Sequence, residues 1–256
     1  MRNPNRIAIV TGGLSGMGRA IASRLARDGT VVFIGARRGA DPELTRGLTG
    51  QFGDRIGFDR LDVRDSQSCE GFVGRVLDAY GRIDILVNAA GVYEEAPVSG
   101  HPDRIWDDTI DTNLTGTFKM IRAVMPSMMR QKWGRIVNLA SVAAHQGMAD
   151  NAAYCASKAG LLGLGRCVAL EGAAAGVTCN SVSPTWVETE MLKKFIDDEV
   201  AQGAPRSEVV ARYEASNPQG KLVQPEEVAE LVAYLTSEAA RAVTMADYQV
   251  NAGSLW

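Results

Sequence analysis

Tyr154 and Lys158 stand four positions apart, and this spacing is the clearest chemical signal in the chain. On a helix it places both side chains on one face, close enough to interact. A free tyrosine has a pKa of about 10, which is too high for a ready base at neutral pH. A neighbouring ammonium stabilises the phenolate and lowers that pKa. The pair therefore predicts a proton-transfer site serving an alkoxide or an alcohol; the alternative is an amphipathic helix without chemistry.

A glycine-rich segment follows the first apolar run and precedes an amphipathic stretch. Gly12, Gly16 and Gly18 let the backbone turn tightly and let a pyrophosphate approach it. A helix that begins inside the segment offers free N–H groups and the positive end of its dipole to phosphates. The pattern predicts a dinucleotide-binding loop; the alternative is a turn that needs glycine only for packing.

Short apolar runs, mostly continuous, alternate with helical patterns along the chain. Continuous runs are typical of strands covered on both faces, and a βαβα alternation predicts a parallel sheet. Helix start signals stand at Asp65 and Pro225, and a stop signal stands at Gly29. The fold class is therefore α/β, a single doubly wound (Rossmann) parallel sheet of about seven strands with helices on both faces. The expected strands are 7–10, 31–34, 55–58, 83–88, 135–139, 178–182 and 248–251.

The bulk composition restricts the kind of protein. The 256 residues suffice for one large α/β domain, so we expect a single domain over 1–256. A net charge of −3 without a basic stripe gives no indication of a nucleic-acid partner. No apolar stretch is long enough for a membrane span or a signal peptide, so we expect no membrane association and a cytoplasmic location. The four cysteines form no CxxC pair and no cluster with histidine, which predicts reduced thiols, mostly near the core, and no metal site.

The segment 185–220 interrupts the alternation. It contains no strand pattern and mixes polar residues with helix formers between the sixth and seventh expected strands. A connection of this length favours a functional lid or substrate loop. The alternative is a surface helical hairpin that only packs on the sheet.

The ordered set of motifs resembles the short-chain dehydrogenase/reductase family along nearly the whole chain. The spacing Gly-x-x-x-Gly-x-Gly in the first loop differs from the common dinucleotide fingerprint and is similar to that of this family. The other matching motifs are NAAG at 88–91, Asn113, Ser141, YCASK at 154–158, NSVSP at 180–184 and VNAG at 250–253.

The resemblance implies roles for individual residues. Ser141 would hydrogen-bond the substrate carbonyl oxygen beside Tyr154 and stabilise a developing oxyanion. Asn113 would hold a water that links Lys158 to solvent as a proton relay, and Lys158 would also bind the nicotinamide ribose. The implied cofactor-binding residues are Thr11, Gly12, Ser15, Gly16, Met17, Gly18, Arg37, Arg38, Asp62, Val63, Asn88, Ala89, Gly91, Tyr154, Lys158, Pro184, Val187 and Thr189, with Asp62 and Val63 at the adenine.

The choice of cofactor is encoded after the second strand. NAD-specific members of the family usually carry an acidic residue there for the ribose hydroxyls, and the aligned position here is Ala36. Arg37 and Arg38 follow, and a guanidinium can bind phosphate oxygens bidentately. We therefore expect NADP(H), with NAD as the lesser alternative. Many NADP-dependent relatives carry a basic residue where this chain has Ser15, and the two arginines have a second interpretation as solvated loop charges.

These observations predict an NADP(H)-dependent oxidoreductase that transfers a hydride between the nicotinamide and a ketone or secondary alcohol. The segments 111–116 and 220–250 are similar to β-ketoacyl and polyketide ketoreductases, which implies a 3-oxoacyl, polyketide or similar carbonyl substrate. The insert after Thr189 is similar to 3-hydroxybutyrate dehydrogenases, so an NAD-dependent dehydrogenase of 3-hydroxybutyrate or a sugar alcohol is the alternative. A non-catalytic cofactor-sensing scaffold is disfavoured because Tyr154 and Lys158 are both retained. The resemblance also implies a homotetramer built through the helix carrying Tyr154 and the chain end near Trp256.

The sequence departs from the usual family pattern at three positions. Thr185 stands where a glycine generally follows the proline, Ala89 replaces an asparagine and Ala252 replaces a glycine. None of these changes removes a catalytic group. His145 and Tyr93 are further candidates for the lining of the substrate cavity, with ordinary loop residues as the alternative.

Overall fold

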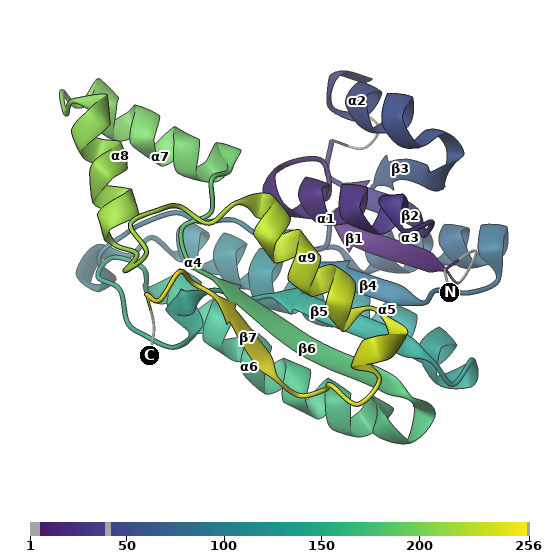
Figure 1. The fold of residues 1–256 in the computed structure, drawn as a ribbon. Coiled ribbons are helices and arrows are strands. Elements are labelled where there is room, and N and C mark those ends of the chain that lie inside the picture. Colours follow the sequence, from purple (N-terminus) through teal and green to yellow (C-terminus); the bar gives the residue numbers. More distant parts are fainter. Residues whose placement is uncertain (1–5, 39–41, 255–256) are drawn as a thin grey trace.

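The apolar runs pair into one parallel sheet with the strand order β3-β2-β1-β4-β5-β6-β7 (Figure 1). The computed structural model describes residues 6–38 and 42–254. The predicted α/β class and the seven expected strands are confirmed, with strand ends that shift by up to about two residues. The strands are β1 (Ile7–Thr11), β2 (Val31–Ala36), β3 (Ile56–Arg60), β4 (Ile85–Asn88), β5 (Gly134–Leu139), β6 (Val177–Pro184) and β7 (Asp247–Val250).

The central strands β1, β4, β5 and β6 bury side chains on both faces, because helices cover the sheet on both sides (Figure 1). Val10 of β1 belongs to a core shared with helices α1, α2 and α9, whereas its neighbour Ile9 belongs to a second core shared with α3, α5 and α6. This alternation explains why the strands read as continuous apolar runs. The helices are α1 (Gly16–Arg27), α2 (Pro42–Phe52), α3 (Ser66–Tyr80), α4 (Asp103–Ile110), α5 (Gly116–Arg130), α6 (Ala152–Gly172), α7 (Glu190–Ala201), α8 (Arg206–Ala215) and α9 (Pro225–Leu235).

The helix signals in the sequence act as predicted. The Asp65 carboxylate accepts a hydrogen bond from the Gln67 amide and caps α3. Pro225 occupies the first turn of α9. Helix α1 ends at Arg27, and Gly29 two residues later adopts a φ of +91°, a backbone conformation that favours glycine.

The order of the strands reverses between β1 and β4. From β1 the chain moves outward to β2 and β3, then returns to β4 on the other side of β1 and continues to β7. Ligands of such sheets bind at the carboxyl ends of the strands beside this reversal. The glycine-rich loop after β1 and the loop after β4 meet there, and Ser141 follows β5 at the same edge.

The long segment between β6 and β7 folds as a helical hairpin of α7 and α8, which projects beyond the carboxyl edge of the sheet (Figure 1). Its small apolar centre contains Leu192, Ile196 and Val209. A short bridge between Val187 and Val223 closes its base.

The four cysteines are free. Cys69 and Cys179 are buried as predicted, whereas Cys155 is half-buried and Cys167 is exposed on α6. Burial raises the pKa of the Cys69 thiol to about 11 and that of the Cys179 thiol to about 12, so neither is poised for nucleophilic chemistry. Across the described ranges, no helix is both long and apolar enough to cross a membrane.

Candidate active site

Three of the predicted catalytic side chains converge on one cavity. Ser141 lies after β5 and caps a short 3-10 turn, where its hydroxyl accepts a hydrogen bond from the Ala143 amide at 3.2 Å. Tyr154 and Lys158 lie one turn apart at the start of α6. The cavity measures about 350 Å³, and the α7–α8 segment forms its opposite wall. The predicted Ser, Tyr and Lys set therefore faces a space large enough for a small organic substrate.

Tyr154 is held as a neutral phenol. Its removal from solvent raises its pKa to about 12, and a hydrogen bond with the Ser141 hydroxyl opposes this shift. The Tyr93 ring packs edge-on against it with centroids 4.9 Å apart. At neutral pH the phenol therefore retains its proton and can donate it.

Lys158 is buried, with 6 % of its surface exposed. Its Nζ donates a hydrogen bond to the Leu139 carbonyl at 2.7 Å and lies 5.5 Å from the centre of the Tyr154 ring. Desolvation lowers its pKa to about 8. The prediction that this ammonium lowers the Tyr154 pKa is wrong for the arrangement seen here, because the ammonium is bonded to the backbone and the burial of the phenol has the larger effect.

Asn113 occupies a π-helical turn, Asp111–Thr115, between α4 and α5. Its amide donates to the Val92 carbonyl at 3.0 Å and to the Ser157 hydroxyl at 3.1 Å, and its oxygen accepts from the Val92 amide at 2.8 Å. The side chain thus connects the loop after β4 to α6, where its partner Ser157 lies between Tyr154 and Lys158 in the sequence. Positioning is the role that its contacts establish, and the proton relay stays a prediction.

A second cleft of about 580 Å³ runs along the carboxyl ends of β1 to β4. Its glycines allow very close packing: a Cβ on Gly12 would lie 2.8 Å from the Ala90 Cα, and one on Gly18 would lie 2.5 Å from the Gly12 carbonyl oxygen. Ser15 precedes α1 and makes no side-chain cap, so the first amides of α1 have no local side chain to bond and can serve an anion that approaches from elsewhere. The predicted cofactor residues that line this cleft are Gly12, Ser15, Gly16, Met17, Gly18, Arg37, Arg38, Asp62, Val63, Ala89, Gly91 and Thr189.

Two predicted cofactor residues lie behind the cleft. Thr11 is buried, and its hydroxyl accepts hydrogen bonds from the Ala89 and Ala90 amides at 3.1 Å each. Asn88 is also buried and donates to the Asn138 side chain at 2.9 Å. These side chains fix the floor of the site. Tyr154, Lys158, Pro184 and Val187 line the adjoining catalytic cavity, and Thr189 borders both spaces.

At the far end of the cleft, Asp62 is held in an ion pair, whereas Arg37 and Arg38 are exposed. Asp62 accepts hydrogen bonds from Arg64 at 2.8 and 3.1 Å, and these bonds lower its pKa. Arg37 and Arg38 are exposed at the rim, and within residues 6–38 and 42–254 neither has a hydrogen-bonded carboxylate partner. The charge of Arg37 also acts on the nearby Asp62 and helps to lower the pKa of that carboxyl. Two exposed guanidinium groups at one rim can bind the oxygens of a phosphate monoester.

An aromatic series connects the catalytic tyrosine to the hairpin. Tyr93 packs against Tyr154 and against Phe195, each with centroids 4.9 Å apart. The Trp186 ring packs edge-on against two more rings, with its centroid 6.4 Å from that of Phe195 and 4.9 Å from that of Tyr213. The candidate Tyr93 therefore lines the cavity, whereas the sequence offered no signal for the contacts of Trp186 and Phe195 because they depend on the hairpin's conformation.

His145 agrees with the second of its two interpretations, that of an ordinary loop residue. Its Nε2 lies 2.7 Å from the Asp247 carboxylate, which also accepts a hydrogen bond from the Ser183 hydroxyl at 2.7 Å. His145 is not among the side chains that line the catalytic cavity. It secures the turn after Ser141 to the β6–β7 pair.

Thr185 and Glu190 give the hairpin two polar attachments. The Thr185 hydroxyl donates to the buried Asn217 side chain at 3.0 Å, which joins the two ends of the segment. The Glu190 carboxylate accepts a hydrogen bond from the Gly16 amide at 2.9 Å, at the start of α1. No local pattern singles out Glu190, because its place beside the glycine-rich loop depends on the tertiary fold.

A parallel sheet with a glycine loop at its reversal point and a Ser–Tyr–Lys set beside it defines an oxidoreductase that acts on CH–OH or carbonyl groups. A family model described as Enoyl-(Acyl carrier protein) reductase matches residues 12–254. The chain accordingly belongs to the short-chain dehydrogenase/reductase family, and the resemblance seen in the motifs is confirmed.

The relatives are similar over their full lengths. The chain is 39% identical over 255 residues to a protein assigned as a ketoacyl reductase of the monensin polyketide synthase in Streptomyces virginiae, covering 98% of each chain. It is 35% identical to the 3-oxoacyl-(acyl-carrier-protein) reductase FabG of Escherichia coli, covering 99% of this chain and 98% of that one. A substituted actinorhodin polyketide ketoreductase, crystallised with NADPH, superposes with a TM-score of 0.91 at 36% identity, covering 99% and 98% of the two chains.

Proposed function

We propose that the protein is an NADP(H)-dependent reductase of 3-oxoacyl- or polyketide-type ketones. The observation that carries the proposal is the adjacency of two spaces: a cavity faced by Ser141, Tyr154 and Lys158, and a cleft with two exposed arginines at its far end. The names of the similar proteins, ketoacyl and 3-oxoacyl reductases, support the same substrate class.

The residues of the cleft fit a dinucleotide. The glycine loop forms a cradle that side chains would fill, and the first amide of α1 already donates a hydrogen bond to an anion, the Glu190 carboxylate. Gly16, Met17 and Gly18 would hold the diphosphate, and Arg37 and Arg38 would hold a 2′-phosphate on the adenosine ribose. Asp62 and Val63 would flank the adenine.

The chain's own residues can supply the proton chemistry. When bound, the nicotinamide supplies the hydride. Ser141 would hydrogen-bond the carbonyl oxygen and stabilise the charge that develops on it. Tyr154, a neutral phenol with its pKa raised to about 12, would donate its proton to that oxygen. Lys158 would place a positive charge beside the phenol and compensate the charge left by the proton.

The cavity wall supports a substrate with an apolar body. Tyr93, Trp186 and Phe195 present aromatic surface, and Val142 and Met148 add aliphatic surface. Apolar walls with a few convergent polar groups suit a ligand that carries one carbonyl on a carbon skeleton. A sugar alcohol, with hydroxyls along its whole length, would leave most of its hydrogen bonds unmet there.

Cofactor titration tests the proposal. A charge-assisted hydrogen bond contributes roughly 1.5–3 kcal/mol, and exposure at the rim favours the lower end. We expect NADPH to bind at least about tenfold more tightly than NADH. The double variant Ala36→Asp with Arg37→Ala should narrow or reverse this preference, because it adds a ribose-binding carboxylate and removes a phosphate-binding cation.

The assay adds a substrate panel: a 3-oxoacyl thioester, a cyclic aryl ketone, 3-hydroxybutyrate and a sugar alcohol, each with both cofactors. Turnover of the ketones with NADPH supports the proposal. Equal or tighter binding of NADH, together with oxidation of 3-hydroxybutyrate, would replace it with the NAD-dependent alternative.

A homotetramer remains the proposed assembly. Large apolar side chains are exposed on three neighbouring helices: Trp106 on α4, Phe118 on α5 and Leu170 on α6. Exposed apolar surface of this kind is typical of subunit contacts. The proposed contact near Trp256 lies outside the described residues. Light scattering in solution measures the number of subunits, and we expect four.

A further inference from the structure

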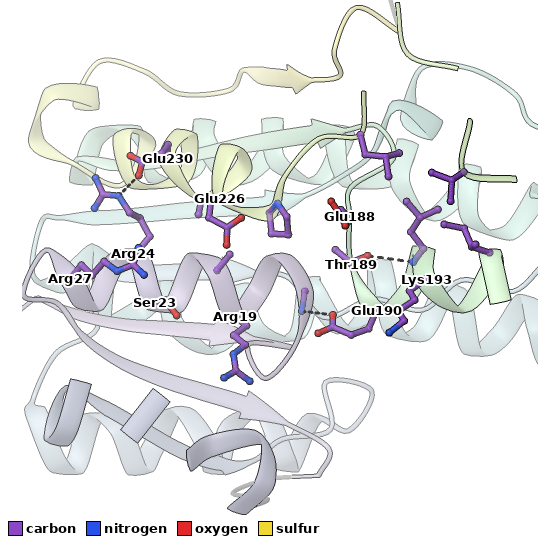
Figure 2. A pocket seen from close by; sticks show the side chains of 18 of the residues that line it. Arg19, Ser23, Arg24, Arg27, Glu188, Thr189, Glu190, Lys193, Glu226 and Glu230 are labelled. Atoms are coloured by element: carbon purple, nitrogen blue, oxygen red, sulfur yellow. Dashed lines mark hydrogen bonds and ion pairs between the residues drawn. The ribbon is translucent and has the colours of Figure 1, made fainter. Parts of the chain in front are cut away.

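The glycine loop and the α7–α8 hairpin meet at a charged contact between Glu190 and Gly16. Figure 2 shows Glu190 reaching from the start of α7 toward the start of α1, where its carboxylate accepts the Gly16 N–H at 2.9 Å. The two elements are packed closely here: a Cβ on Gly16 would lie 3.2 Å from the Thr189 methyl carbon and 3.5 Å from a Glu190 carboxylate oxygen.

The Glu190 carboxylate lies at the N-termini of two helices, and each N-terminus favours a negative charge. It belongs to the first turn of α7, and it bonds the first amide of α1. The positive ends of two helix dipoles therefore act on one negative charge. Since Ser15 makes no side-chain cap on α1, Glu190 takes the place of a capping group.

The same amide belongs to the proposed diphosphate site. Gly16, Thr189 and Glu190 line the cofactor cleft. The same three residues also line a further cleft of about 680 Å³, which lies between α1, α9 and the hairpin. The Glu190–Gly16 hydrogen bond thus lies at the boundary of the two clefts. A diphosphate cannot take the Gly16 N–H while the carboxylate holds it, and the two like charges repel at short range.

We propose that Glu190 is an internal competitor of the cofactor diphosphate, which occupies the phosphate-binding amide of the free protein and must be displaced before the dinucleotide seats fully. The proposal rests on the proposed dinucleotide-dependent function. The free protein divides between a closed form with the bond made and an open form that binds, so the measured affinity is reduced by the closed fraction. Glu190 is a positioning residue in this scheme and takes no part in hydride or proton transfer.

The test removes the charge and keeps the shape. Glu190→Gln leaves a neutral acceptor with a weaker hold on the amide and no repulsion toward phosphate. We expect NADPH to bind this variant about three- to tenfold more tightly than the parent, measured by equilibrium titration of cofactor fluorescence. A residue that only supports the structure would weaken binding or leave it unchanged when altered.

Two controls sharpen the result. Glu188→Gln removes an equal charge two positions away, where the carboxylate bonds the Gln224 side chain at 2.9 Å, and it should leave the NADPH affinity unchanged. Adenosine 2′-monophosphate lacks the diphosphate, so it should bind the parent and Glu190→Gln equally. An equal gain from Glu188→Gln, or for adenosine 2′-monophosphate, would reduce the effect to overall charge and overturn the proposal.

The remaining outcomes separate the two levels of inference. If the parent binds NADPH and Glu190→Gln binds it equally or more weakly, the competition is refuted while the proposed function stands. Weaker binding would show that the carboxylate serves the bound cofactor. If the parent binds neither NADPH nor NADH, the proposed function fails and the competition fails with it.

Discussion

The two walls of the catalytic cavity are held in place by different means. On one wall, Ser141, Lys158 and Asn113 are buried, and each has a hydrogen-bond partner in the turn after β5, on the sheet or on α6. The opposite wall is the α7–α8 hairpin, whose centre contains only three buried apolar side chains. Its exposed Met191 faces the same cavity.

The difference separates two tasks. Proton transfer requires groups that are fixed before the substrate arrives, which a packed sheet edge provides. Substrate entry requires a wall that can move, and elements with few buried contacts open at low free-energy cost. Changes on the first wall should therefore affect the rate of the chemical step, and changes on the second should affect binding and local opening.

The largest effect is expected from Tyr154→Phe. The variant keeps the ring and removes the proton donor, so kcat should fall by about 100-fold or more while the NADPH affinity stays within about twofold. Steady-state kinetics and cofactor titration measure both quantities. Tyr93→Phe is the matched control, since it keeps the ring that packs on Tyr154 and should change kcat far less. A Tyr154→Phe variant with more than half of the parent rate would contradict the assigned role.

An intermediate effect is expected from pH. Burial lowers the pKa of Lys158 to about 8, so its charge is present below that pH and is lost as the pH rises through it. Tyr154, with its pKa at about 12, keeps its proton throughout this range. If the ammonium assists catalysis, kcat/KM for ketone reduction should be level below pH 8 and fall by up to about tenfold per unit above it.

Lys158→Arg provides the control for that profile. A guanidinium keeps its charge across the whole range, so the alkaline decline should disappear even where the absolute rate drops. A parent profile that stays level to pH 10 would remove the lysine charge from the mechanism.

The smallest effect is expected at the base of the hairpin. Thr185→Val keeps the shape and removes the hydroxyl that bonds Asn217. One such bond contributes about 1 kcal/mol net, so hydrogen exchange over 185–220 should accelerate by roughly fivefold in the free protein, and KM should rise with kcat nearly unchanged. NADPH should slow exchange over the same residues in the parent. Ser207→Ala, on the exposed side of α8, is the control; equal exchange with and without NADPH would make the segment a static connection.

The sequence predicted the first wall better than the second for a physical reason. The strands, the caps at Asp65 and Pro225, and the Tyr154–Lys158 spacing depend on local periodicity and on residues a few positions apart. The contact of Glu190 with Gly16 spans 174 positions, and it depends on how the hairpin folds back over α1. No local pattern encodes such a contact.

The protonation of the site shows a second limit. Spacing placed Lys158 on the same face as Tyr154, but it did not reveal that the ammonium bonds the Leu139 carbonyl or how far the phenol is buried. The balance between burial and charge fixes the pKa, and both depend on the tertiary environment. Thr11 and Asn88 illustrate the same limit, since their motifs lie at the site while their side chains support it from behind.

The π-helical turn Asp111–Thr115 has a consequence for how the length of this chain can change. Such a turn holds one residue more than a regular α-helix over the same span, and each residue advances a helix by about 100°. Deleting one residue there would restore regular winding and rotate Asn113 away from Val92 and Ser157, breaking the tie between the loop after β4 and α6. The turn at 202–205 between α7 and α8 carries no comparable tie and can gain or lose residues at small cost. Insertions and deletions in homologous chains should therefore collect in the hairpin and avoid the α4–α5 junction.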